Sequence, residues 1–153
     1  MLKKLILITL LLVFGIPSSI QAQTEMDCKM LEPIFGKDAV QAKNGICAVE
    51  ILRNELNLTH MGKKMSAESM DIAFHASFEK VDTGTAVMGE LALLEDEVNP
   101  VIDELRKGGL EISALHNHML YEHPRIMFVH FQGMGDMKEQ ANAIKSAIEK
   151  TKH

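Results

Sequence analysis

The fold of this chain is decided by TAVMGELALLEDEVNPVIDEL, residues 85–105. Residues 85–94 are mostly apolar, which predicts a strand covered on both faces. The apolar residues of 98–105 recur at i, i+3, i+4 and i+7, the spacing of an amphipathic helix. Asn99-Pro100 fits an N-cap followed by the first helical residue, and Gly108-Gly109 fits the end of the helix. The stretch therefore predicts a strand that leads into a helix.

Downstream of this stretch, the pattern predicts one strand over 110–120 and another over 125–132, joined by a short loop that ends at Pro124. A final helix follows, with Asp136 as its N-cap. The order strand–helix–strand–strand–helix in the C-terminal half indicates an α+β fold with helices packed on a largely antiparallel sheet.

Upstream, the pattern predicts a short helix within 28–37 and strands over 45–53, 57–61 and 70–81. Nothing after Gln23 has the composition of a linker or of a low-complexity tract. We therefore expect residues 23–153 to form a single α+β domain.

Residues 1–22 have the layout of a secretory signal peptide: a basic start, an apolar run and small residues up to Ala22. The apolar run is shorter than the roughly 20 residues that span a bilayer. No cysteine follows Ala22 directly, which argues against a lipoprotein anchor. We expect cleavage near Ala22 and export to the periplasm or medium, without a stable membrane anchor after cleavage.

The charge of the chain restricts its partners. The formal net charge is -5, and without residues 1–22 there remain 14 basic residues against 21 acidic ones. An acidic protein of this kind lacks the basic face that binds nucleic acid or an anionic membrane surface. The sequence therefore predicts no nucleic-acid partner, and it is compatible with a metal cation as ligand.

Export also changes the interpretation of the two cysteines. Cys28 and Cys47 lie 19 positions apart, without the C-x-x-C spacing of a redox pair. Because oxidising compartments favour pairing, we expect a structural Cys28–Cys47 disulfide.

Four of the seven histidines fall between residues 116 and 130. His116 and His118 point to the same side of a strand because side chains alternate, and we expect Leu110 and Ile112 to share that side as core residues. If the hairpin pairs Met127 with Asn117, Phe128 with His116 and His130 with Ala114, His130 joins them on this face. Neutral imidazoles suit zinc and copper ions, so His116, His118 and His130 are predicted metal ligands, zinc first and copper second.

Further residues are candidates for the same site. Glu90 lies within an apolar strand, where a carboxylate is costly unless it is paired or coordinates a metal, so it is a weaker fourth ligand. His75 could approach if its strand neighbours the others. Glu90 or Glu122 are candidate general bases, and Arg125 is a candidate for binding an anionic group. The alternative for each is a structural or solvent-facing residue.

The segments MGELALLEDEVNP (88–100), GLEISALHNH (109–118), PR (124–125) and HFQGMGD (130–136) together resemble the LppY/LpqO family, exported bacterial proteins built from a domain of unknown function. The resemblance implies export and no established reaction. Its motif positions here are His116, His118, Glu122, Pro124, Arg125 and His130. Members often carry two copies of the domain, which implies that a homodimer could rebuild a shared site in this single-copy chain.

Three hypotheses remain open at this point. The first is an exported protein that binds zinc or copper through the histidines, and the second is a metal-dependent hydrolase or lyase acting on a small polar substrate. The third is a non-catalytic envelope module that binds a small polar ligand, with the histidines shaping its pocket. No phosphate-binding glycine loop, G-x-S-x-G elbow or H-E-x-x-H helix indicates another chemistry.

Overall fold

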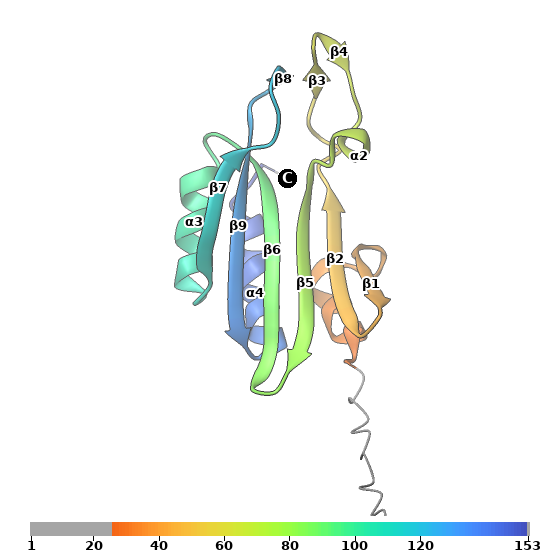
Figure 1. Cartoon of the computed structure of the whole chain (residues 1–153), viewed down its shortest axis with the longest axis vertical. Coiled ribbons are helices and arrows are strands. Elements are labelled where there is room, and N and C mark those ends of the chain that lie inside the picture. The colour runs from red at the N-terminus through yellow and green to blue at the C-terminus, as the bar shows by residue number, and fades with distance from the viewer. Residues whose placement is uncertain (1–25, 153) are drawn as a thin grey trace, which may run out of the picture.

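The computed structural model describes residues 26–152, so the predicted signal peptide lies outside the described residues. The chain forms a six-stranded antiparallel sheet and a three-stranded one, which confirms the predicted α+β class (Figure 1). The six strands lie in the order β1-β2-β5-β6-β9-β7, and the small sheet has the order β4-β3-β8. The strands are β1 (Val40–Lys43), β2 (Ile46–Leu52), β3 (Thr59–His60), β4 (Lys63–Lys64), β5 (Ala73–Val81), β6 (Gly84–Leu94), β7 (Glu111–Asn117), β8 (Glu122–His123) and β9 (Ile126–Gly135).

The helices other than α2 pack on one face of the large sheet and leave the other face open over much of its length (Figure 1). The two longest are α3 (Val98–Lys107) and α4 (Met137–Ile148); the shorter ones are η1 (Cys28–Leu31), α1 (Glu32–Phe35), η2 (Lys37–Ala39) and α2 (Ala67–Met70). The main core lies between them and the sheet, where Val101 of α3 and Ile144 of α4 are buried with Leu91 and Phe131.

A second, smaller core lies at the end of the large sheet where the three-stranded sheet projects beyond it (Figure 1). It contains Leu58 and Ile72 together with Ala92 of β6 and Phe128 of β9. Ala92 and Phe128 belong to the open face, so that face is covered only at this end. The prediction that residues 85–94 are covered on both faces is therefore right only near Ala92, and Met88 is 64% exposed.

The predicted helices are present, with one difference at a cap. Asp136 caps α4 as predicted, since its side chain accepts hydrogen bonds from the backbone N–H groups of Lys138 and Glu139. Helix α3 begins at Val98, with Glu97 in the N-cap position, so the predicted Asn99 cap is wrong. Glu97 is not available to cap because its carboxylate is used in a buried ion pair.

A β-bulge in β7 corrects one predicted face. The ladder with β9 shifts by one residue between Ile112 and Ala114. Ile112 pairs with Phe131 and packs against the main core, whereas Ala114 and His116 lie on the open face. The prediction that Ile112 and His116 share a face is wrong, because the extra residue of the bulge reverses the alternation. The predicted pairs of Asn117, His116 and Ala114 with 127, 128 and 130 are confirmed.

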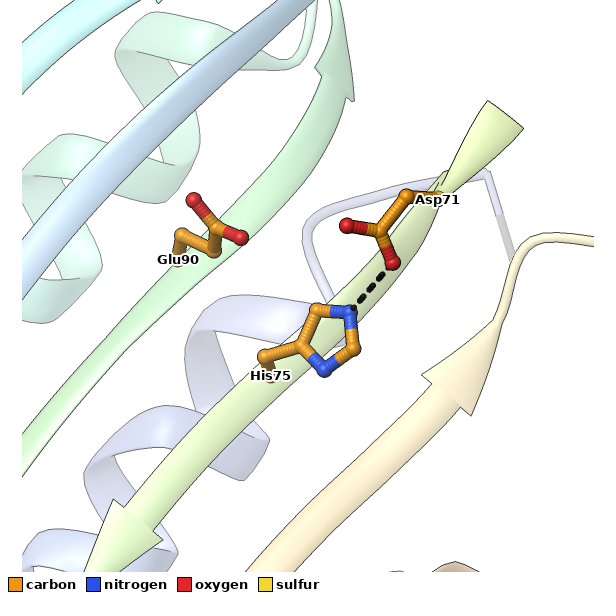
Figure 2. Close-up of side chains that lie close together, drawn as sticks. All are labelled: Asp71, His75 and Glu90. Atoms are coloured by element: carbon orange, nitrogen blue, oxygen red, sulfur yellow. Dashed lines mark ion pairs between the residues drawn. The ribbon is translucent and has the colours of Figure 1, made fainter. Parts of the chain in front are cut away.

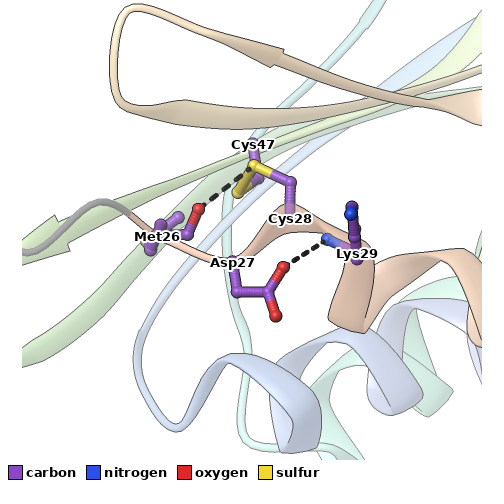
Figure 3. The surroundings of a disulfide bond; sticks show 5 residues. All are labelled: Met26, Asp27, Cys28, Lys29 and Cys47. Atoms are coloured by element: carbon purple, nitrogen blue, oxygen red, sulfur yellow. Dashed lines mark hydrogen bonds between the residues drawn. A yellow bond between two sulfur atoms is a disulfide. The ribbon is translucent and has the colours of Figure 1, made fainter.

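The predicted disulfide is present. Cys28 of η1 is bonded to Cys47 of β2, and both cysteines are buried (Figure 3). The bridge attaches the N-terminal helical segment to the large sheet. A disulfide is consistent with an exported protein, because oxidising compartments preserve such bonds. Within residues 26–152, no helix is long and apolar enough to cross a membrane.

A buried ion pair joins β2 to α3. Arg53 is fully buried and is held by both carboxylate oxygens of Glu97, by Glu55 at 2.7 Å and by the Ala92 carbonyl at 3.1 Å. The Glu97 carboxylate also accepts hydrogen bonds from the backbone N–H groups of Leu94 and Lys152. The network therefore closes around the charged groups and ties the C-terminal end of the chain to the helix start.

Candidate metal centre

Polar side chains cross the open face of the large sheet in register. His75 on β5 pairs with Glu90 on β6, and Glu90 pairs with His130 on β9. Directly paired residues in an antiparallel ladder point to the same side, so these three side chains share the open face. Together with Asp71, just before β5, and His116 on β7, we call them the histidine–carboxylate row.

His130 is the meeting point of three groups. Its Nε2 atom lies 2.8 Å from Nε2 of His116 and 3.1 Å from Oε2 of Glu90. The His116 and His130 rings are 5.0 Å apart between centroids. The predicted hairpin register brings the two imidazoles together, and the pairing of β6 with β9 places the Glu90 carboxylate next to His130.

The tautomer of His116 is set by its backbone. Its Nδ1 lies 2.9 Å from the Asn117 carbonyl oxygen, which only accepts hydrogen bonds, so Nδ1 is the donor. In the neutral ring Nε2 then carries a lone pair, and this lone pair is directed at His130. Histidines that bind metals commonly donate their other N–H to a carbonyl in this way, which fixes the ring and its free nitrogen.

The two contacts of His130 Nε2 need more protons than this nitrogen can provide. Nε2 of His130 carries at most one proton, and that proton would have to serve both His116 Nε2 and Glu90 Oε2. A cation at the same place would accept a lone pair from each of the three groups. Ligand atoms around tetrahedral zinc lie about 3.3 Å apart for Zn–N bonds of about 2.0–2.1 Å. Among residues 26–152, the groups whose ligand atoms all lie within 4.8 Å of one another do not include this trio, so His116 and Glu90 would have to move toward each other to bind one ion.

A second set of ligand atoms lies on the other side of Glu90. Asp71, His75 and Glu90 offer three ligand atoms that all lie within 4.8 Å of one another, so this group could hold a metal ion. Nε2 of His75 lies 3.4 Å from Oδ1 of Asp71. Figure 2 shows the three side chains with their polar ends on the same side of the strands.

The row borders a shallow groove. The groove has a volume of about 360 Å³, and Ser77, Met88 and Ser113 line it beside His75, Glu90 and His130. The side chains of His75, Glu90 and His130 are between 27 and 34% exposed. A metal ion bound to these residues would therefore remain open to water or to a small ligand on its groove side.

His118 packs against Phe128, the ring that His116 also stacks on. Strand β7 ends at Asn117, and the His118 ring contacts the edge of Phe128, with 4.3 Å between centroids. Within residues 26–152 it makes no hydrogen bond to His116 or His130. Its role as a ligand stays a prediction.

The remaining candidates, Glu122 and Arg125, pair with each other at 2.8 Å near the small sheet. The Glu122 side chain is fully buried there, and Arg125 also donates to the Met119 carbonyl at 3.2 Å. These contacts fold the loop between β7 and β9 against β3. Neither residue lines the groove beside the row.

Asp71 is the member of the row that the sequence did not indicate. It ends α2 in the left-handed conformation, with φ of 55°, a position that Asp and Asn tolerate. This turn carries its carboxylate to His75, four residues later. The spacing D-x-x-x-H was the available signal, but it acquires meaning only when β5 is known to lie beside β6.

Comparison with known proteins gives a family but no activity. The chain belongs to a family described as a Domain of Unknown Function (DUF1259), whose model matches residues 29–150. No curated protein and no solved structure matches the chain. The chemistry of the row therefore has to carry the functional argument.

Proposed function

We propose that this protein binds a transition-metal ion, zinc in the first place, through His116, His130 and Glu90. The observation that carries the proposal is the position of His130 Nε2, which lies within 3.1 Å of a second imidazole nitrogen and of a carboxylate oxygen. The carbonyl of Asn117 supports it, because it holds His116 with its Nε2 lone pair facing the same point.

The test is the response of the purified protein to zinc after treatment with EDTA. Zinc at 100 times its dissociation constant is expected to raise the free energy of unfolding by about 2.7 kcal/mol. His130→Ala should reduce this response, because it removes the nitrogen that lies beside both His116 and Glu90. His123→Ala, which removes an exposed histidine of β8 outside the row, should retain it. A wild-type melting temperature that ignores both zinc and copper(II) would overturn the proposal.

A metal-dependent hydrolase or lyase is the second candidate function, and the groove favours it. Half-exposed ligands beside a groove of about 360 Å³ leave room for a metal-bound water and a small polar substrate. Glu122 and Arg125 are less suited to catalysis than their sequence positions indicated, since their mutual ion pair lies away from the groove.

We also propose that the protein acts outside the cytoplasm, as a member of the LppY/LpqO type. The apolar leader in residues 1–22 and the Cys28–Cys47 disulfide support export. Mass spectrometry of the N-terminus of protein recovered from the periplasm or medium tests this, with cleavage near Ala22 as the expected result. Recovery of the full-length chain from the cytoplasm alone would contradict it.

A further inference from the structure

We infer that the histidine–carboxylate row holds two metal ions, with Glu90 shared between them. The inference rests on the proposed function for the His116–His130 side of the row and adds a second site on the Asp71–His75 side. The two sides are built from different strands, and Glu90 is the residue common to both. The ligand class is a pair of divalent transition-metal ions held by nitrogen and carboxylate oxygen.

The second side carries its own indication of a missing ligand. Nε2 of His75 is buried and has no hydrogen-bond partner, although it lies 3.4 Å from Oδ1 of Asp71. A buried nitrogen without a partner loses its hydration without compensation. Because the Glu90 carboxylate lies within the same 4.8 Å group, an ion there would satisfy the nitrogen and both carboxylates together.

Glu90 is placed to bridge. It lies on β6, and its cross-strand neighbours are His75 on one side and His130 on the other. Adjacent strands are about 4.8 Å apart, so the two imidazoles approach the carboxylate from opposite sides. Oε2 faces His130 at 3.1 Å, and the same carboxylate offers a ligand atom to the group that it forms with Asp71 and His75.

Each half of the row offers two potential ligands besides Glu90. On one side, His130 is supported by a second ligand, His116, and on the other His75 is supported by Asp71. Each ion would therefore have two ligands of its own and one oxygen of Glu90, with further positions open toward the groove. Carboxylate-bridged ions in two-metal sites lie about 3.5–4 Å apart, a separation that one carboxylate group can span.

The experiment is a measurement of zinc stoichiometry by equilibrium dialysis and elemental analysis of the purified protein. Wild type is expected to bind two zinc ions per chain. Asp71→Asn and His116→Ala should each bind one, because each removes a private ligand from one side. Glu90→Gln should weaken both ions at least tenfold. Asn keeps the left-handed backbone at position 71, so that variant isolates the lost charge.

Glu50→Gln is the matched control. Glu50 lies on β2 directly opposite His75 and is exposed. The substitution therefore removes the same charge from the same face of the sheet, one strand away from the row. It should still bind two zinc ions. Circular dichroism of every variant verifies that the fold is retained.

The outcomes separate the two proposals. One zinc per chain, lost in His130→Ala and unaffected by Asp71→Asn, would overturn the two-ion inference and leave the proposed function intact. No zinc in wild type would overturn both. In copper(II)-loaded protein, an electron paramagnetic resonance spectrum with dipolar coupling between two ions would support the pair directly, and an uncoupled spectrum at two copper ions per chain would overturn a shared Glu90.

Discussion

Two clusters of charged and polar side chains in this protein use similar groups in different ways. In the first, the buried Arg53 guanidinium and the Glu97 carboxylate meet in a bidentate pair, and Glu55 and backbone groups provide their further hydrogen bonds. In the second, the histidine–carboxylate row, His130 Nε2 is shared by two neighbours and His75 Nε2 has no hydrogen-bond partner. The first cluster is closed to solvent, whereas the second borders a groove.

The difference separates a structural network from the proposed binding site. A closed network has no bonding position left for a ligand, and its contribution is to hold β2, α3 and the C-terminal end together. In an open network, several lone pairs lie close together without enough protons between them, and a bound cation would accept these lone pairs. Perturbing Arg53 should therefore change stability, and perturbing the row should change ligand binding.

The largest expected effect is that of Arg53→Met. It leaves the Glu97 carboxylate buried without its charged partner, which should lower the free energy of unfolding by about 3–5 kcal/mol in urea denaturation. Zinc binding, measured below the melting temperature, should be unchanged because the row is untouched.

The matched control for Arg53→Met is Lys107→Met. It removes a cation from the exposed pair with Glu104, where solvent screens the interaction, so stability should hardly change. Equal losses of stability in the two variants would show that the closed network has no special role.

An intermediate effect is expected from acid. Burial favours a higher pKa for Glu97, but the hydrogen bonds from Arg53 and from the backbone N–H groups of Lys152 and Leu94 outweigh it, so the pKa of this carboxyl lies below its usual value. Its contribution to stability is therefore complete above the unfolded-state pKa of about 4.3 and is lost as the pH falls through the lower folded-state pKa.

The measurement is the free energy of unfolding from about pH 6 down to about pH 2, the range over which carboxyl groups become protonated. Wild type should lose stability below about pH 4.3 more steeply than Glu97→Gln. The same slope in both proteins would mean that other carboxyl groups account for the acid sensitivity.

The smallest expected effect is that of His130→Ala on the metal-free protein. The side chain is partly exposed and lies outside both cores, so the free energy of unfolding should change by less than about 0.5 kcal/mol. A loss of several kcal/mol in urea denaturation without metal would mean that the row is itself a structural network, and the contrast with Arg53 would disappear.

Much of the fold could be predicted from the chain alone because its C-terminal half has strong periodicity. The apolar residues of 98–105 and the Asp136 cap predict α3 and α4, and the length of the loop before Pro124 sets the β7–β9 register. The short elements β1, β8 and α2 were not predicted. They have two to four residues each, too few for a periodic pattern. Strand β8 also depends on pairing with the distant β3.

Only the His116–His130 side of the row was predicted from the sequence. His116 and His130 belong to one hairpin, so their meeting follows from local register. His75 and Glu90 also lie on consecutive strands, joined by a two-residue turn, but the register of this hairpin was not predicted from the sequence. Asp71 depends in addition on the left-handed turn that ends α2. Arg53 was equally invisible, because its partner Glu97 is 44 residues away and it resembles any charge at the end of a strand.

The bulge between Ile112 and Ala114 has a consequence for how this strand can vary. Before the bulge, even-numbered residues of β7 such as Ile112 face the helices. After the bulge, even-numbered residues such as His116 face the open side of the sheet. Substitutions at Ile112 are limited by the volume of the main core, whereas those at His116 are limited by lone pairs and charge. The sequence at the two ends of β7 is therefore constrained independently, and residues around His116 can be substituted without repacking the helices.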